Sequence, residues 1–368
     1  MSGFMSTQIR FRRPPFCPNP QCNSRTKPST WHYIKKGFFF RDQVPQKIQR
    51  YRCSHCRRSF SSQTFSPTYW LKLPQLQPLL MFRVLGCSAF RQIAWELGVA
   101  PSTVQRQVDR LGRHCLLLHE LLRPASAPQE RLVLDGLRCF EFGQYWPFDV
   151  NLLIGQSHFL YGFQDSELRR SGTMTPFQRR KRLRLERRHG RPDPQATRKS
   201  VQELLTRQLP PGARVALDTD DHRAYPQALR RLPDRDIAHR TTASKAARTP
   251  QNPLFPANLG DLLIRHTGAN QKRETIAFSK RRQGALYRLA IWGVARNYLR
   301  PASVRRKQPP PGVTVGAIAR PWSVRDVLRA RLLPWRFELP GWMAECYFGR
   351  IPTRRMPRCR AHTLKYAA

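Results

Sequence analysis

Apolar runs in the middle of the chain predict an α/β unit. Three short runs rich in Val, Leu, Ile and Phe follow one another, and each has the length and composition of a strand. Because only Gln156 and Ser157 separate the second run from the third, we expect these strands to be antiparallel. Helices and two further strands then alternate. The expected order is strand 131–142, strand 150–155, strand 158–163, helix 197–209, a strand from 214 that ends in acids, helix 225–231, strand 236–239 and a long helix 272–299.

Two helices upstream of this unit, 89–98 and 102–111, predict a helix-turn-helix. Ala94, Gly98 and Val104 fall where the motif needs a small packing residue, a left-handed turn and a buried contact. An ordinary pair of helices within a core is the alternative interpretation.

The second of these helices would be the one that reads DNA. Ser102 or Thr103 can cap its first turn. It would enter the major groove of the duplex and present polar side chains to the base edges. These side chains would be Thr103, Gln105 and Arg106.

Four of the nine cysteines form two close pairs near the N-terminus, separated by thirty residues. That separation leaves room for a β-hairpin, and the spacing is typical of a zinc ribbon in which four thiolates hold Zn²⁺ tetrahedrally. With no open coordination position, the zinc would be structural. An odd number of cysteines, four of them grouped, also favours a reducing compartment. The expected ligands are Cys17, Cys22, Cys53 and Cys56, with His32 and His55 as alternatives.

The formal charge of +43 changes the picture most, since 66 basic residues face 23 acidic ones. Such self-repulsion favours a polyanionic partner, and double-stranded DNA fits because each neutralised phosphate releases counterions. A hydrophobic content of 40% excludes a fully disordered tail. No apolar stretch reaches the ~18 residues of a membrane-spanning helix, so we expect a cytoplasmic protein associated with the nucleoid. The basic segment 169–191 would grip the DNA backbone through Arg179, Arg180 and Arg182.

Acidic residues fall on two strands of the α/β unit. Asp135 lies in the first strand among apolar neighbours, where a lone buried carboxylate would be costly. The fourth strand ends in Asp218, Asp220 and Asp221. We favour Asp220 because it lies at the strand end, just before the next helix. Asp218 points to the same side of the strand and remains the alternative.

Glu274 is the only acid in a long basic stretch, residues 262–325. An ion pair with Arg273 or Arg281 on a helix face would explain it simply. Acids on three separate elements favour a metal site instead. Mg²⁺ prefers carboxylate ligands, and carboxylates grouped without a cation would repel one another.

Together these features resemble bacterial insertion-sequence transposases of the DDE class. The matching segments fall between residues 15 and 340 and include 134–136, 219–225 and 273–281, besides the cysteine pairs. The resemblance implies a multidomain chain with an N-terminal zinc ribbon, a helical helix-turn-helix and an α/β ribonuclease-H-like catalytic core. The corresponding boundaries are 12–68, 69–120 and 131–300, followed by a basic C-terminal segment at 301–368.

The same resemblance implies that Asp135, Asp220 and Glu274 form a catalytic triad that binds two Mg²⁺ or Mn²⁺ ions. The chemistry would be DNA strand cleavage followed by strand transfer, carried out by a homo-oligomer on DNA. The long gap between Asp220 and Glu274 implies an insertion at 243–267, where three prolines indicate a loop. The side chains that would contact phosphates beside the site are Arg273, Lys280 and Arg281.

Two other functions use the same features. A non-catalytic DNA-binding regulator, or an inactive transposase relic, needs the ribbon and the helix-turn-helix but not the acids. A structure-specific nuclease of the same fold would cut branched DNA without joining ends. The C-terminal segment contains a basic amphipathic helix at 322–333, which would bind DNA or a second subunit.

Overall fold

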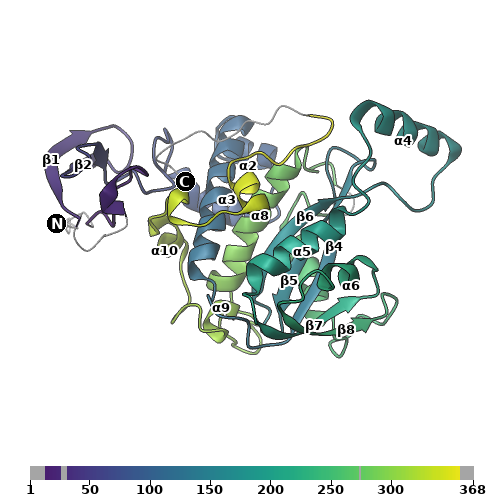
Figure 1. Ribbon diagram of the computed structural model, residues 1–368. Helices are drawn as coiled ribbons and strands as arrows, with labels where there is room; N and C mark the ends of the chain where they lie inside the picture. The colour runs from purple at the N-terminus through teal and green to yellow at the C-terminus, as the bar shows by residue number, and fades with distance from the viewer. Residues whose placement is uncertain (1–12, 26–30, 273–274, 357–368) are drawn as a thin grey trace.

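The computed structural model describes residues 13–25, 31–272 and 275–356, and it is a mixed α/β protein with two separate sheets (Figure 1). The small sheet is antiparallel and lies to one side of the body. Aromatic rings and cysteines form its core, which Leu333 joins from far along the chain. Trp31 and Tyr51 are two of the buried rings. The strands are β1 (Tyr33–Phe40), β2 (Lys47–Cys53) and β3 (Ser59–Ser61), after a short 3-10 helix at Asn23–Arg25.

The large sheet has five strands in the order β6-β5-β4-β7-β8. Its first three strands along the chain are antiparallel neighbours, which confirms the prediction from the sequence. The fourth and fifth strands add in parallel beside β4. The strands are β4 (Leu132–Phe140), β5 (Pro147–Gly155), β6 (Leu160–Glu167), β7 (Arg214–Asp220) and β8 (Asp236–Thr242).

Side-chain alternation along β5 separates the helices that cover the two faces of this sheet. Asn151 donates from its amide to Ser200 Oγ of α5 (Ala196–Gln208) at 2.9 Å. Ile154 points to the other face, where it packs against Gly260 of α7 (Phe255–Thr267). α6 (Ala224–Leu229) packs against α5. Thus α7 covers the face opposite to α5.

A helical layer is continuous with the sheet in one hydrophobic core. Its central pair is α3 (Pro101–Leu122) and α8 (Arg282–Val294), which pack against each other. A Cβ on Gly112 would lie 2.4 Å from Tyr287 Cβ, so only glycine allows this approach. α1 (Leu76–Leu85) and α2 (Phe90–Glu96) pack on α3, and a π-helical turn (Ala295–Leu299) extends α8.

Three expectations about helices were wrong. The late helix begins at Arg282 rather than at 272, because residues 275–281 form a turn and bends, with Ser279 held in a bridge to Glu141. The stretch expected as a loop contains α7, and Pro256 lies in its first turn, where a missing N–H costs little. The second helix of the helix-turn-helix begins at Pro101 after Ala100, so neither Ser102 nor Thr103 caps it.

One helix, α4 (Pro176–His189), projects from the body within the basic segment (Figure 1). None of its residues is buried. Thr175 Oγ1 caps it by accepting a hydrogen bond from the Gln178 N–H at 3.2 Å. The helix is therefore held by its cap and by polar contacts of Arg182 and Glu186 with the preceding chain, and not by a core.

The C-terminal elements are short. They pack against the large hydrophobic core through Val327 and Tyr347, and against the core of the small sheet through Leu333. The helix expected at 322–333 extends only over α10 (Val324–Arg329). Within the described ranges we find no helix with the length and apolar character needed to cross a bilayer. The remaining elements are α9 (Pro311–Thr314), a 3-10 turn (Pro334–Arg336) and α11 (Gly341–Tyr347).

Candidate functional site

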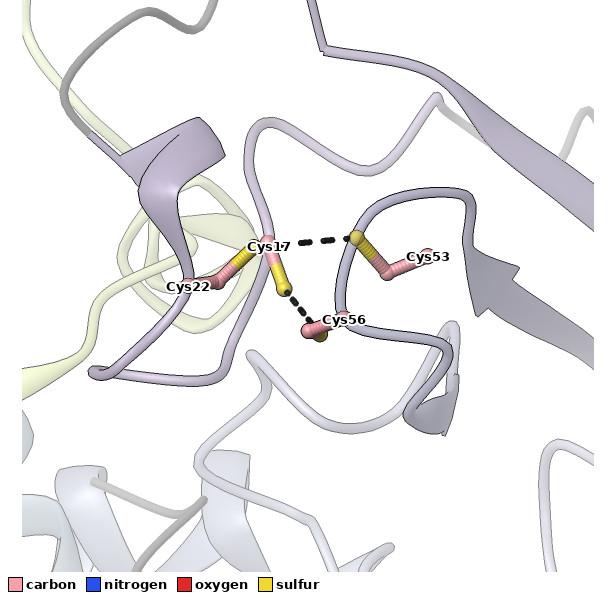
Figure 2. A group of neighbouring side chains, drawn as sticks. All are labelled: Cys17, Cys22, Cys53 and Cys56. Atoms are coloured by element: carbon pink, nitrogen blue, oxygen red, sulfur yellow. Dashed lines mark hydrogen bonds between the residues drawn. The ribbon is translucent and has the colours of Figure 1, made fainter.

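Four cysteines from two turns of the small sheet point toward one another (Figure 2). Their sulfur atoms all lie within 4.8 Å of one another. Cys17 Sγ is 3.6 Å from Cys56 Sγ, and Cys22 Sγ is 3.8 Å from Cys53 Sγ. A tetrahedral ion with Zn–S bonds of about 2.3 Å separates its sulfurs by about 3.8 Å. The cluster could therefore bind a metal such as zinc.

The surroundings act in opposite directions on two thiols of the cluster: burial raises the pKa of Cys17, whereas hydrogen bonds lower that of Cys53. The Trp31 indole N–H donates to Cys53 Sγ at 3.2 Å. Burial opposes ionisation of Cys53, but hydrogen bonds from the Cys56 N–H and from Trp31 outweigh it and lower its pKa to about 7. His32 and His55 are exposed and do not belong to the cluster, so the donor set is four sulfurs.

A cavity of about 580 Å³, which we call the acidic cavity, lies where β4, β7 and α7 meet, and three aspartates and three arginines line it. Asp135 of β4 and Asp220 at the end of β7 are both in its wall. Leu134 and Thr219 are partners in the parallel pair, so the next residue of each strand is a neighbour of the other. Asp135 also pairs with Leu152 of β5, which places its side chain on the face that α7 covers.

The helix α7 adds a carboxylate that the sequence analysis missed. Asp261 lines the same cavity as Asp135 and Asp220. Its Oδ1 is buried and has no hydrogen-bond partner among the described residues. An orphaned carboxylate oxygen beside other carboxylates is the donor set of a hard cation such as Mg²⁺ or Mn²⁺. These residues fit such an ion.

The raised pKa values of two aspartates indicate that the cavity disfavours negative charge when no cation is bound. Burial raises the pKa of Asp135 to about 6, and the charges of Asp220 and Asp149 act in the same direction. Burial and the charge of Asp135 raise the pKa of Asp261 to about 7. Arg248 partly opposes both shifts. A bound cation would remove this cost.

The three aspartates are spread more widely than the ligands of a single ion. Among the described residues, only the cysteine cluster has three or more donor atoms all within 4.8 Å of one another. A site for two cations ~3.5–4 Å apart accommodates the wider spread.

The two other acids near the end of β7, Asp218 and Asp221, have partners outside the acidic cavity. Asp218 is fully buried and forms ion pairs with Arg131 at 3.1 Å and Arg240 at 2.8 Å. Asp221 is exposed and accepts from the Ser244 N–H at 3.3 Å. Neither lines the acidic cavity, whereas Asp220 does.

Glu274 and Arg273 lie outside the described residues, so the structure says nothing of their side chains. A signal in the sequence could have pointed to Asp261. Buried positions recur at helical spacing along α7, and they are Pro256, Ala257, Gly260, Ile264 and Thr267. An acid next to that apolar stripe is out of place on a simple amphipathic helix.

The expected DNA-reading residues lie at the start of α3. Gln105 and Arg106 are exposed, and Thr103 is half-buried. All three line a second cavity, together with Arg281 from the start of α8. The second half of α3 is buried in the large core, so the helix-turn-helix and the α/β unit share one interior.

The other expected phosphate contacts lie on exposed chain. Arg179 and Arg180 are exposed on α4, and Lys280 is exposed just before α8. Arg182 is half-buried, because it pairs with Glu186 at 3.5 Å and donates to the Arg170 carbonyl at 3.0 Å.

Comparison with known proteins adds little to this picture. No family model matches the chain, and no curated protein matches it. Among solved structures, the chain is similar to one in the cryoEM structure of the simian T-cell lymphotropic virus intasome in complex with PP2A regulatory subunit B56 gamma. The likeness covers 69% of this chain and 74% of that chain, with 11% identity and a TM-score of 0.23. At this TM-score it carries no argument about fold or function.

Proposed function

We propose that the protein is a metal-dependent enzyme that cleaves DNA strands and joins them to new DNA, as a transposase does. The observation that carries this proposal is the convergence of Asp135, Asp220 and Asp261 on one cavity. These three carboxylates would hold the cations, and Arg248 in the same wall would attract a phosphate of the strand. Mg²⁺ or Mn²⁺ bound there would act as a Lewis acid on the phosphodiester oxygens.

The arrangement of the large sheet supports this proposal. Three antiparallel strands followed by two parallel ones, in the order β6-β5-β4-β7-β8, agree with a ribonuclease-H-like core. In that core the acids come from the first strand, the end of the fourth strand and a late helix. Here the first helix after the fifth strand is α7, so we propose Asp261 in place of Glu274 as the third acid.

Basic elements around the core support DNA as the substrate. The net charge is +43, the start of α3 is exposed and polar, and α4 carries exposed arginines away from the body. Backbone contacts of this kind position a duplex whatever its sequence. The cysteine cluster would hold the ribbon rigid with a structural zinc.

Cleavage of DNA by purified protein tests the proposal. The substrate would be a plasmid that carries the natural DNA flanking the coding sequence, incubated with Mg²⁺ or Mn²⁺. We expect Asp135→Asn, Asp220→Asn and Asp261→Asn each to lose cleavage by about 100-fold or more. Glu274→Gln should stay close to the wild type. Asp236→Asn, an exposed acid at the start of β8, is the matched control.

Other results would select another function. Binding of DNA without cleavage by the wild type would favour a regulator or an inactive relic. Cleavage without joined products would favour a nuclease. Loss of activity in Glu274→Gln with full activity in Asp261→Asn would return the third acid to Glu274.

A further inference from the structure

A second cavity lies between α3 and α8, apart from the candidate metal site. Its volume is about 640 Å³, and it shares no residue with the acidic cavity. A volume of about 300–1,000 Å³ is typical of small-ligand sites. Ser102 and Thr103 line it from the first turn of α3, and Gln283 and Gly284 from the first turn of α8. The positive ends of two helix dipoles therefore meet at one cavity, which favours an anion.

Cationic side chains reinforce this preference. Lys72 and Arg281 lie in the wall beside arginines from three successive turns of α3, namely Arg106, Arg110 and Arg113. Arg110 is 6% exposed and Arg113 is 9% exposed. Burial and the charge of Arg113 lower the pKa of Arg110 to about 10, a sign that the two cations repel each other. Asp109 is the one acid among the lining residues.

The buried arginines leave donor capacity unused. Arg110 donates to the Tyr69 carbonyl, which occupies part of its guanidinium group. The Nε of Arg113 is buried and has no hydrogen-bond partner among the described residues. Its guanidinium carbon lies 5.8 Å from the centroid of the Tyr287 ring. A buried guanidinium with an unsatisfied N–H is stabilised when a phosphate oxygen accepts from it.

An aromatic ring stands at the rim of the same cavity. Trp70 lines it and is 78% exposed, with its neighbour Tyr69 in edge contact at 6.0 Å between centroids. An exposed indole beside a basic cavity is a platform on which a nucleobase can stack. Phosphate donors and a stacking ring lie together on the wall of one cavity.

We propose that the cavity between α3 and α8 binds a nucleotide, with its phosphate held by Arg110 and Arg113 and its base stacked on Trp70. The nucleotide belongs either to a strand of DNA or to a free mononucleotide, and both share this chemistry. The proposal does not rest on the proposed catalytic function, because the lining residues are different and no metal ion is needed.

Calorimetric titration without divalent cations tests the site with three probes: inorganic phosphate, dTMP and the hexanucleotide d(T)6. A Cβ on Gly284 meets no atom within 4 Å, so a side chain there enters open space. Gly284→Glu adds a negative charge to the cavity, and Gly284→Ala is its matched control. We expect Gly284→Glu and Arg113→Gln to weaken dTMP binding at least tenfold. Arg325→Gln, an exposed arginine of α10 outside the cavity, should leave it unchanged.

The remaining arms separate the parts of the proposal. Trp70→Ala should weaken dTMP and d(T)6 but not inorganic phosphate, because only the nucleotides carry a base. Binding of d(T)6 at least tenfold tighter than dTMP identifies a DNA strand as the ligand, and equal binding identifies the mononucleotide. Equal affinity of Gly284→Glu and Gly284→Ala for dTMP would overturn the proposal. Because the titration contains no divalent cation and the lining residues differ from those of the metal site, failure of the catalytic proposal would leave this result intact.

Discussion

Asp261 illustrates how the surroundings of a single carboxylate make it a candidate ligand. It lies on α7 with one buried oxygen that no described residue satisfies, in a cavity that already holds Asp135 and Asp220. Grouping these acids therefore destabilises the folded protein when they are ionised, and such perturbed acids are common at functional sites. Asp218 shows the opposite case, since its fully buried carboxylate forms ion pairs with two arginines.

The raised pKa of Asp261 predicts a dependence of stability on pH. Its pKa is about 7 in the folded protein against an ordinary value of 3.8. A carboxyl with a raised pKa contributes its full stability below the unfolded pKa and loses it as the pH rises through the folded pKa. In metal-free protein we therefore expect Asp261→Asn to be more stable than the wild type. The advantage should grow between about pH 4 and about pH 7 and reach about 2 kcal/mol, because solvent screens a half-buried group.

Urea unfolding in the presence of a chelator, repeated across this pH range, measures the difference. Asp236→Asn should follow the wild type throughout. Added Mg²⁺ or Mn²⁺ should stabilise the wild type but not Asp261→Asn, since the cation needs the carboxylate. A wild type and an Asp261→Asn variant of equal stability at every pH would contradict the assignment of a buried, repelled acid.

Among the elements, the α3–α8 pair joins the helix-turn-helix to the α/β unit that contains the large sheet. α3 supplies the exposed start of the helix-turn-helix, and its later turns pack on α8 behind the large sheet. Gly112 makes this contact possible, because a Cβ would lie 2.4 Å from that of Tyr287. DNA held by the first turns of α3 would therefore be held by the same rigid body that carries the acidic cavity.

Gly112→Ala should destabilise the protein by about 2–3 kcal/mol, because the added methyl overpacks the α3–α8 contact. Gly284→Ala is the matched control on the partner helix. Its Cβ enters open space, and the higher helix propensity of alanine should add up to about 0.5 kcal/mol. Chemical denaturation of the two variants beside the wild type gives the comparison. A Gly112→Ala variant as stable as the control would mean that the helices move apart at no cost.

Unlike α3 and α8, the helix α4 has no buried residue, so packing does not stabilise it. Glu186 accepts from Arg169 at 2.8 Å and so ties the helix to the chain that precedes it. Isolated helices of this length are marginal in water. A surface partner that neutralises its arginines would stabilise it.

Replacing four exposed arginines of α4 with glutamine should weaken DNA binding without a loss of stability. The four are Arg179, Arg180, Arg187 and Arg188. Each lost phosphate contact reduces the slope of log K against log salt by about 0.9, so the slope should fall by about 2–4. Binding isotherms at several salt concentrations measure it, with Arg230→Gln/Arg231→Gln as a control at an exposed turn after α6. An unchanged slope would show that α4 does not contact the backbone.

At the scale of the whole molecule, two main hydrophobic clusters hold most of the buried apolar side chains of the described chain, beside a third of Val133, Leu254 and Ala257. The larger one includes the large sheet and the helical layer, and the smaller one surrounds the four cysteines. Leu333 and Trp335 of the C-terminal segment pack into the smaller cluster. The small sheet has few strands and little apolar area of its own, so a bound metal would supply much of its stability.

Loss of the metal should therefore unfold the small sheet and leave the large one folded. We expect the wild type to hold one zinc and Cys53→Ser to hold none. Metal analysis with hydrogen exchange should show loss of protection in β1 and β2 and full protection in β4. Cys87→Ser, a half-buried cysteine outside the cluster, should keep its zinc. Full zinc occupancy in Cys53→Ser would exclude the cluster as the binding site.

Several features were accessible without coordinates. The cysteine spacing led directly to the cluster of four sulfurs. Asp135 and Asp220, chosen from their places on apolar strands, line one cavity, and their role as metal ligands stays a prediction. Asp261 was missed because three nearby prolines suggested a loop, whereas Pro256 only begins a helix. The late helix was placed too early because its pattern does not show the bridge between Ser279 and Glu141.

The sequence by itself determined what depends on neighbours along the chain: the five strands, most of the helices, the paired cysteines and the excess of positive charge. Strand and helix periods repeat over a few residues, so a short stretch of sequence is enough to indicate the secondary structure. Only the tertiary structure decided which acids share a cavity and that α3 and α8 enclose a second, basic one. These meetings depend on how elements far apart in the chain pack, and the same residue pattern is compatible with many packings.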